Sequence, residues 1–142
     1  NHQFNTDEET LKHFARFANI YKAWAGYRKQ LVKDAARKGH PVVRHPWVHY
    51  QNDDAVRLLK YQFMIGADFM VAPVLDPGTA SVDVYLPKGN WTHLFTGQVH
   101  SHTQGKWIAV AAPIGTPAVF YKTESKSGEQ FRQSLLADGL IE

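Results

Sequence analysis

Apolar residues recur every three or four positions from Leu11 to Lys38, and this period predicts two consecutive helices. The sequence Thr6-Asp7-Glu8-Glu9 predicts a capping box at the start, with Thr6 as the N-cap. Gly26 predicts a break, because glycine costs about 1 kcal/mol relative to alanine inside a helix. A basic last turn followed by Gly39 predicts the second C-terminus. The apolar stripe of the first helix comprises Leu11, Phe14, Ala15, Ala18, Tyr21, Trp24 and Ala25.

The middle of the chain joins this helical half to a β half. Val42-Val43 predicts a short apolar strand that ends in the polar pair Arg44-His45. Asn52-Asp53 offers an N-cap for a short amphipathic helix from Ala55 to Phe63. A second apolar strand is predicted at Phe69–Ala72.

Beyond Phe69 the apolar period changes from 3.6 to 2. Alternating segments separated by turn sequences rich in Gly, Pro and Asn predict strands near residues 82–86, 91–95, 107–110 and 118–121. Short strands at this spacing are typical of an antiparallel sandwich or barrel. A terminal helix is predicted from Ser127 or Gly128, with a small apolar face.

The predicted helices carry more apolar surface than a sheet of this size can cover. The strand at Val42 has no predicted partner, and a lone strand after a helix is half of a repeating β/α unit. We therefore expect the missing partners to lie outside this sequence or in another chain. The polar start, NHQFNTDEET, has no initiator Met and no apolar leader, which favours the interior of a longer polypeptide.

Composition narrows the function classes. The chain has 142 residues, 44% of them hydrophobic, which permits one domain with a real core. Its formal charge of +3 is scattered, so nucleic-acid binding has little support. There is no cysteine, which excludes disulfides and fits a reducing compartment, so we expect a cytoplasmic protein. No apolar run approaches the roughly 18–20 residues of a membrane span.

Several polar groups have a structural interpretation. His45 and His49 are four residues apart, but Pro46 between them argues against a helical metal site. The pair Asp53-Asp54 lies just ahead of a helix, which favours capping over a catalytic dyad. Asp68 is interpreted as a buried acid with a backbone or Arg partner. No nucleophile elbow, phosphate loop or dinucleotide motif occurs, and we predict no metal, cofactor or catalytic residue in this segment.

Arg44 and His45 are the candidate binding residues. They lie at the end of an apolar strand that follows a helix, and a β/α barrel carries its catalytic and binding residues at the C-terminal ends of its strands. Side chains alternate along a strand, so one of the two should point inward and the other toward the surrounding helices. Two interpretations stay open: a substrate-pocket role for one of the pair, or an ion pair between Arg44 and an acid of a neighbouring barrel element.

Aromatic content suggests an alternative class of protein. The chain has four Trp, six Tyr and eight Phe. Trp91, Trp107 and Tyr85 could form the sugar-stacking platform of a free-standing carbohydrate-binding or interaction module. Residues at alternating strand positions are more often part of the core.

The run GHPVVRHPWVHYQNDD, then YQFMIGADFMVAPVLDPGTASVDVYLPKGNWTHLFTGQ, then APIGTPAVFY, resembles the C-terminal third of glycoside hydrolase family 31 retaining α-glycosidases. The resemblance covers Leu11 to Tyr121, with its motifs in order. His45 stands between Arg44 and Pro46 where most members place Pro directly after Arg, and Gly26 replaces a common Pro. The segment NHQF…HFARFANIY and the short polar tail are most similar to the sulfoquinovosidase branch.

The resemblance implies a fold. Residues 1–65 would finish a (β/α)₈ TIM barrel, and residues 66–142 would form a C-terminal antiparallel β-sandwich with a terminal helix. The family's two catalytic aspartates lie on earlier barrel strands, so this segment alone should be inactive.

The resemblance also implies a function. The expected substrates are α-glycosides of 6-sulfoquinovose such as sulfoquinovosyl glycerol, with Arg44 and His45 at the substrate. The expected partner is the remaining N-terminal part of the same enzyme, and a homo-oligomer stays open. An α-glucosidase or α-xylosidase of the same family is the alternative. No cofactor, nucleic acid or membrane is implied.

Overall fold

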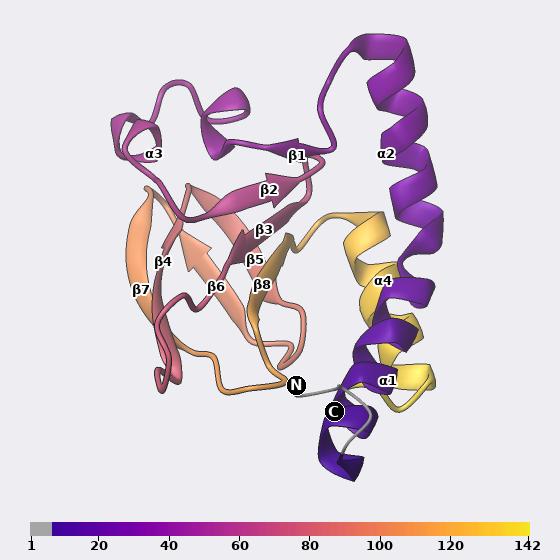
Figure 1. Ribbon diagram of the computed structural model, residues 1–142. Coiled ribbons are helices and arrows are strands. Elements are labelled where there is room, and N and C mark those ends of the chain that lie inside the picture. Colours follow the sequence, from indigo (N-terminus) through magenta and orange to yellow (C-terminus); the bar gives the residue numbers. More distant parts are fainter. Residues whose placement is uncertain (1–6) are drawn as a thin grey trace.

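The computed structural model describes residues 7–142, which form a mostly antiparallel β structure with a few helices (Figure 1). The helices are α1 (Glu8–Ala23), α2 (Ala25–Lys38), the 3₁₀ turn η1 (Pro46–Val48), α3 (Asp54–Arg57) and α4 (Lys126–Ala137). The strands are β1 (Val43–Arg44), β2 (Phe63–Ile65), β3 (Phe69–Ala72), β4 (Ser81–Leu86), β5 (Gly89–His93), β6 (Val99–His102), β7 (Lys106–Ala111) and β8 (Ala118–Lys122). No described helix has the length and apolar character needed to cross a membrane.

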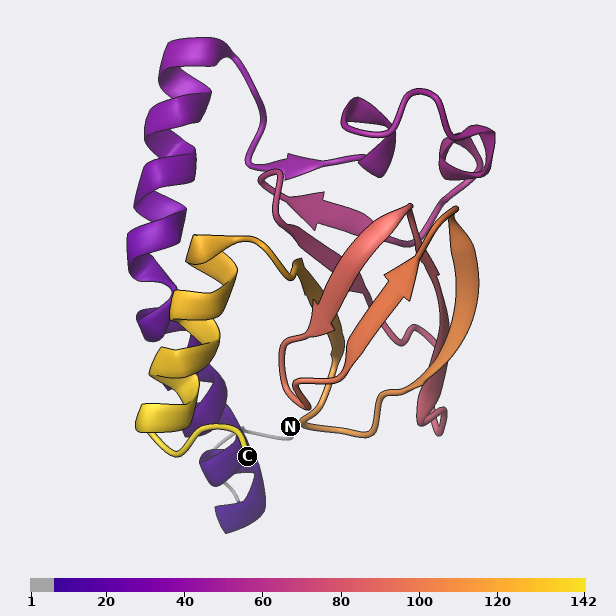
Figure 2. The same ribbon diagram turned by 180° about the vertical axis from the view of Figure 1, so that it is seen from behind.

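The strands form two sheets. Six lie in the order β1-β2-β3-β8-β5-β6, and β4 pairs with β7 in a separate ribbon. Every pairing is antiparallel. The β4–β7 ribbon covers one side of the larger sheet, and the helices α1, α2 and α4 lie on the other side (Figures 1 and 2). The predicted antiparallel β architecture is therefore confirmed.

The two faces of the six-stranded sheet have separate cores. Met70 lies opposite Phe120, and both pack with Val84 and Leu86 of the β4–β7 ribbon. The neighbouring pair, Phe69 opposite Tyr121, points the other way, because successive strand side chains alternate. That second face packs against α1 and α4.

The strand after Gly39 has its partner within this chain, so the prediction of a missing partner is wrong. β1 pairs with β2 through Val43–Ile65 and Arg44–Met64. The predicted helix from Ala55 to Phe63 is also wrong, since α3 covers only Asp54–Arg57. Met64 is fully buried as a strand residue between β1 and β3, and this tertiary pairing overrides the local helical pattern.

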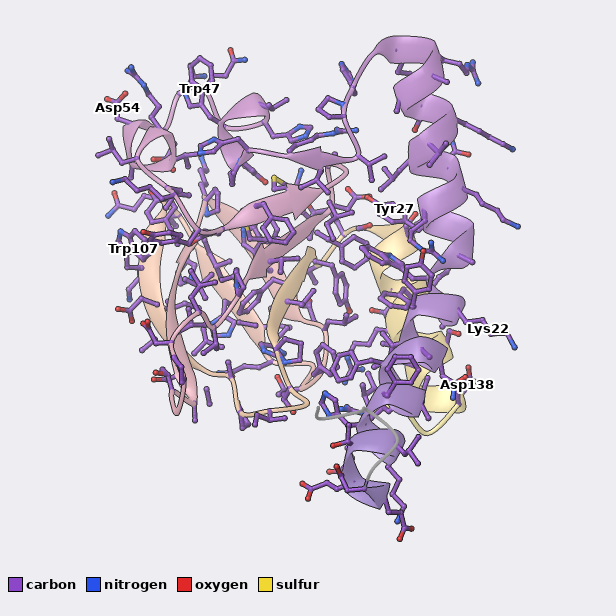
Figure 3. All side chains as sticks on the ribbon, in the orientation of Figure 1. Lys22, Tyr27, Trp47, Asp54, Trp107 and Asp138 are labelled. Carbon is purple, nitrogen blue, oxygen red and sulfur yellow. The ribbon has the colours of Figure 1, made fainter. Side chains whose placement is uncertain are left out.

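Gly66 connects this hairpin to α2. It turns the chain between β2 and β3 with φ of 64°, a conformation that favours glycine. A Cβ atom here would lie 2.6 Å from the Leu31 side chain. Tyr27 of α2 lies beside the sheet (Figure 3), and its hydroxyl donates to the Ile65 carbonyl at 3.3 Å. The hairpin turn thus packs directly on α2.

The helix ends follow the predicted boundaries with small shifts. Asp7 caps α1, accepting from the Thr10 backbone N–H at 2.6 Å, and the predicted cap Thr6 lies outside the described residues. Trp24 separates α1 from α2, close to the predicted break at Gly26. Gly39 ends α2 with φ of 70°, as predicted.

The packed face of α1 differs from the predicted stripe. Phe17, Ile20 and Trp24, spaced by three and four, pack on the sheet and α4. Trp24 stacks on Phe131 of α4, with ring centroids 5.6 Å apart. These contacts hold α1 against the β structure.

Other apolar residues of the N-terminal helices are exposed. The exposed fractions are 41% for Leu11, 57% for Phe14, 61% for Tyr21 and 60% for Val32. We refer to these four residues as the N-terminal flank. The expectation of exposed apolar surface on these helices is confirmed, although Phe17, Ile20 and Trp24 are packed within the chain.

Candidate functional site

Arg44 is buried at the end of β1. Its Nε donates to the Pro41 carbonyl at 2.6 Å, and its Nη1 lies 3.1 Å from His49 Nε2. Because a guanidinium only donates, His49 Nε2 accepts, and the neutral ring carries its proton on Nδ1. Among residues 7–142, Arg44 makes no ion pair with a carboxylate. Its contacts join the beginning of β1 to the end of η1.

Burial and positive charge keep His49 neutral. Burial lowers the pKa of the imidazole, and the charges of Arg44 and Lys122 lower it further. This favours the acceptor form that the Arg44 contact requires. His49 therefore belongs to the Arg44 site, a partnership that the sequence did not indicate.

Asp68 lies half-buried in the β2–β3 turn near this site. Its backbone carbonyl accepts from the Lys122 N–H at 2.9 Å. The predicted Arg partner is absent among the described residues. After burial, the charge of Asp68 is the largest factor that raises the pKa of the nearby Tyr27 hydroxyl.

His45 lies on the opposite side of the strand end and is exposed. Its Nδ1 accepts from the Trp47 backbone N–H at 3.1 Å, so its Nε2 donates to the Leu59 carbonyl at 2.8 Å. Both ring nitrogens are thus engaged in holding η1 and the segment after α3. Arg44 is buried and His45 is exposed, so the two differ in direction as predicted, but His45 does not face the surrounding helices.

Asp53 is a structural acid, as the capping interpretation predicted. Its carboxylate accepts from the Ala55 backbone N–H at 3.2 Å at the start of α3. The Tyr85 hydroxyl donates to both carboxylate oxygens, at 3.0 and 2.9 Å. Burial, then this hydrogen bond and the Asp53 charge, raise the pKa of Tyr85 to about 12. Asp54 points outward (Figure 3) and lies 3.9 Å from Arg57.

The three aromatic residues considered for sugar stacking do not form one platform. Trp91 and Tyr85 are buried, and Trp91 Nε1 donates to the Pro87 carbonyl at 2.9 Å. Trp107 differs, because it lies at the surface of β7 (Figure 3). The core interpretation is confirmed for two of the three residues.

Gln62 is a buried polar residue that sequence reasoning missed. Its side-chain amide donates to the Tyr85 carbonyl at 2.8 Å, and its oxygen accepts from the Tyr85 N–H at 2.7 Å. It thereby joins the segment before β2 to strand β4 of the other sheet. The only sequence signal is a glutamine within an aromatic and apolar run.

Comparison with known proteins gives one consistent result. A family profile described as the glycosyl hydrolase family 31 C-terminal domain matches residues 39–125. The chain is 40% identical over 126 residues to a sulfoquinovosidase of Escherichia coli (strain K12). It is 41% identical over 134 residues to a sulfoquinovosidase of Agrobacterium fabrum (strain C58). These alignments cover 89% and 94% of this chain but 18% and 20% of the relatives, so the chain spans about a fifth of their length.

A solved structure extends this similarity to the backbone. A family 31 sulfoquinovosidase from E. rectale, in complex with an aza-sugar inhibitor, superposes with a TM-score of 0.89 at 34% identity. The superposition covers 96% of this chain and 20% of that chain. Because it takes in almost all of this chain, the similarity includes α1 and α2 as well as the β structure.

Proposed function

Because the chain belongs to glycoside hydrolase family 31, we propose that it serves in a retaining α-glycosidase that hydrolyses α-glycosides of 6-sulfoquinovose. Sulfoquinovosyl glycerol is the proposed natural substrate. The observation that carries this proposal is the similarity to sulfoquinovosidases over nearly the whole chain, including the helices before the matched family domain.

The catalytic carboxylates are proposed to come from a part of the enzyme outside this chain. Retaining glycosidases use two carboxyl groups about 5–5.5 Å apart, one as nucleophile and one as acid and then base. In this chain, Asp53 is held by Ala55 and Tyr85, and Asp54 is exposed beside Arg57. These roles are structural, and we expect no turnover by the 142-residue chain alone.

The chain's proposed place in the enzyme has two parts. Residues 1–65 would supply the end of a (β/α)₈ barrel, and residues 66–142 the β-sandwich with its terminal helix. The N-terminal flank supports a neighbour on α1 and α2, as does the position of β1 at the edge of its sheet. The β2–β3 pairing crosses residue 65, so the two parts would fold as one unit.

Arg44 and His45 are proposed to shape the substrate pocket. The Arg44 guanidinium has five N–H groups, and the contacts described above use only two of them, which leaves donors for a sugar hydroxyl. His45 would act by fixing η1, since both its ring nitrogens are engaged. This arrangement assigns contact to Arg44 and positioning to His45.

Substrate preference tests the proposed activity. The whole enzyme should be assayed with 4-nitrophenyl α-glycosides of sulfoquinovose, glucose and xylose. We expect kcat/KM for the sulfoquinovoside to exceed the others by about a hundredfold or more, because a site that pairs a polar group rejects analogues that lack it. A preference for glucose or xylose would instead indicate another activity of the family. Absence of all three activities would favour a non-catalytic module.

Replacement of Arg44 tests its pocket role. Arg44→Lys keeps the charge but removes the planar fork of donors, so we expect kcat/KM of the folded enzyme to fall about tenfold, together with some loss of stability from the bonds to Pro41 and His49. Arg37→Lys, at the exposed end of α2, is the matched control. If Arg44→Lys lowers only the stability and leaves the kinetics of the folded enzyme unchanged, the pocket role is wrong.

A further inference from the structure

A groove of about 630 Å³ opens along β4, between the segment after α3 and the loop after β3. Its volume falls within the range of about 300–1,000 Å³ found for small-molecule sites. Apolar and aromatic side chains line most of it, and charged groups lie among them. None of the contacts proposed for Arg44 uses this groove.

Two exposed aromatic rings line the groove. Trp107 is 54% exposed and Tyr61 is 68% exposed. Trp107 makes an edge contact with Tyr85, with ring centroids 5.4 Å apart. Tyr85 is in turn held by its hydroxyl bonds to Asp53. The indole is therefore positioned before any ligand arrives, which reduces the entropic cost of binding.

The polar groups of the groove suit hydroxyl ligands. Asp76 and Asp83 line it, and neither carboxylate makes an ion pair within residues 7–142. Ionised carboxylates only accept hydrogen bonds, so they pair with hydroxyl donors. Among the described residues of the lining, Lys60 is the one cation. Two acids against one base disfavour a sulfonated or phosphorylated ligand and favour a neutral one.

We propose that this groove binds a neutral hexopyranose oligosaccharide. The C–H faces of its rings stack on Trp107 and Tyr61, and its hydroxyls donate to Asp76 and Asp83. Pyranose rings combine a flat apolar face with a rim of hydroxyl groups, and the groove presents the complement of both. The site takes a ligand without a sulfonate, and in this it goes beyond the proposed hydrolysis of sulfoquinovosides.

Direct binding to the whole enzyme tests this site. Maltotriose and cellotriose serve as probes in titration calorimetry, since an α-glycosidase does not cleave the β-linkages of cellotriose. We expect saturable binding of at least one trisaccharide, weakened at least about tenfold by Trp107→Ala and less by Tyr61→Ala. Val99→Ala, on β6 outside the groove and also 54% exposed, should bind like the unsubstituted enzyme.

Further variants separate binding from folding and from hydrolysis. Asp83→Asn leaves both rings in place and should weaken binding about threefold, so it carries the test if Trp107→Ala unfolds. Trp107→Ala should hydrolyse a sulfoquinovoside at the unsubstituted rate. If the unsubstituted enzyme itself does not hydrolyse a sulfoquinovoside, the proposed function fails, and the binding result still stands or falls by itself. Absence of saturable binding, or equal affinity in Trp107→Ala, Tyr61→Ala and Asp83→Asn, would overturn the proposal.

Discussion

The β-sandwich and the N-terminal helices bury their apolar side chains to different extents. Leu86 and Val84 are fully buried between the two sheets, whereas Leu11 and Val32 of α1 and α2 are 41% and 60% exposed. The space between the two sheets therefore closes over its own apolar residues, and the helices leave part of their apolar surface exposed. An apolar pattern in the sequence shows that a surface is suited to burial, but the residues that bury it need not belong to the same segment.

Contact between the two regions is confined to one side of the helices. Trp24 meets Phe69 of β3 edge-on, with ring centroids 5.4 Å apart, and stacks on Phe131 of α4. Arg16 of α1 donates from Nε to the Leu140 carbonyl at 2.9 Å. These contacts fix α1 while the side chains of the N-terminal flank stay exposed.

Matched leucine truncations should show the largest difference between the regions. Leu86→Ala removes methyl groups from a closed core and should lower the free energy of unfolding by about 3 kcal/mol. Leu11→Ala should cost less than about 1 kcal/mol, because its side chain is already in contact with water. Urea unfolding of the 142-residue chain measures both. Equal losses would contradict the difference in burial.

Acid should weaken the sandwich through His93. This residue of β5 is 2% exposed, and its Nδ1 accepts from the N–H groups of Phe95 and Thr96 at 3.2 and 3.3 Å. Burial, with a smaller effect from His100, lowers the pKa of His93 to about 4 from the ordinary 6.5. The ring is thus neutral when folded, and protonation of Nδ1 would break both bonds.

The sign of the pH effect follows from this shift. The unfolded chain binds the His93 proton more readily, so stability is complete above about pH 6.5 and falls as the pH drops toward 4. The total loss should be about 3 kcal/mol at the acid end. Unfolding measured from pH 7.5 to 4 in His93→Asn provides the control, which should lose this part of the pH dependence. An unchanged pH profile in the variant would refute the role of His93.

A smaller effect is expected where the two regions meet. Gly66→Ala forces a positive φ on an L-residue and pushes a Cβ toward Leu31 of α2. We expect a loss of about 2 kcal/mol, from left-handed strain and displaced packing. Gly78→Ala has a similar φ of 74° with no neighbour within 4 Å, so it isolates the strain component. If the two variants lose equal stability, the hairpin turn does not depend on its contact with α2.

The sequence predicted the long helices and most of the sandwich strands because their periods repeat over many residues. It failed at Phe63–Ile65, where a short apolar run suits either a helix or a buried strand. Pairing with β1 and β3 decides this segment, and those contacts are non-local. The packed face of α1 was also misassigned, since apolar residues occupy a wide arc of this helix and spacing alone does not show which part is covered.

The candidate site was predictable only in part. Strand alternation predicted that Arg44 and His45 point in opposite directions, but it did not show which of the two is buried. The approach of His49 to Arg44 depends on the 3₁₀ turn η1, which brings a residue five positions later back to the strand end. No periodic pattern marks such a turn. Trp107 on β7 is exposed and Trp91 on β5 is buried, and this difference likewise depends on how the strands pair into two sheets.

The central proposal is that the N-terminal flank lies against the rest of the proposed glycosidase. Val32→Arg tests it most directly when its effect is measured in both the whole enzyme and the 142-residue chain. In the chain alone, an exposed position should tolerate the change within about 0.5 kcal/mol. In the whole enzyme, the unfolding temperature should fall by several degrees, because a charge would be buried without a partner. An equally small effect in both proteins would contradict the claim.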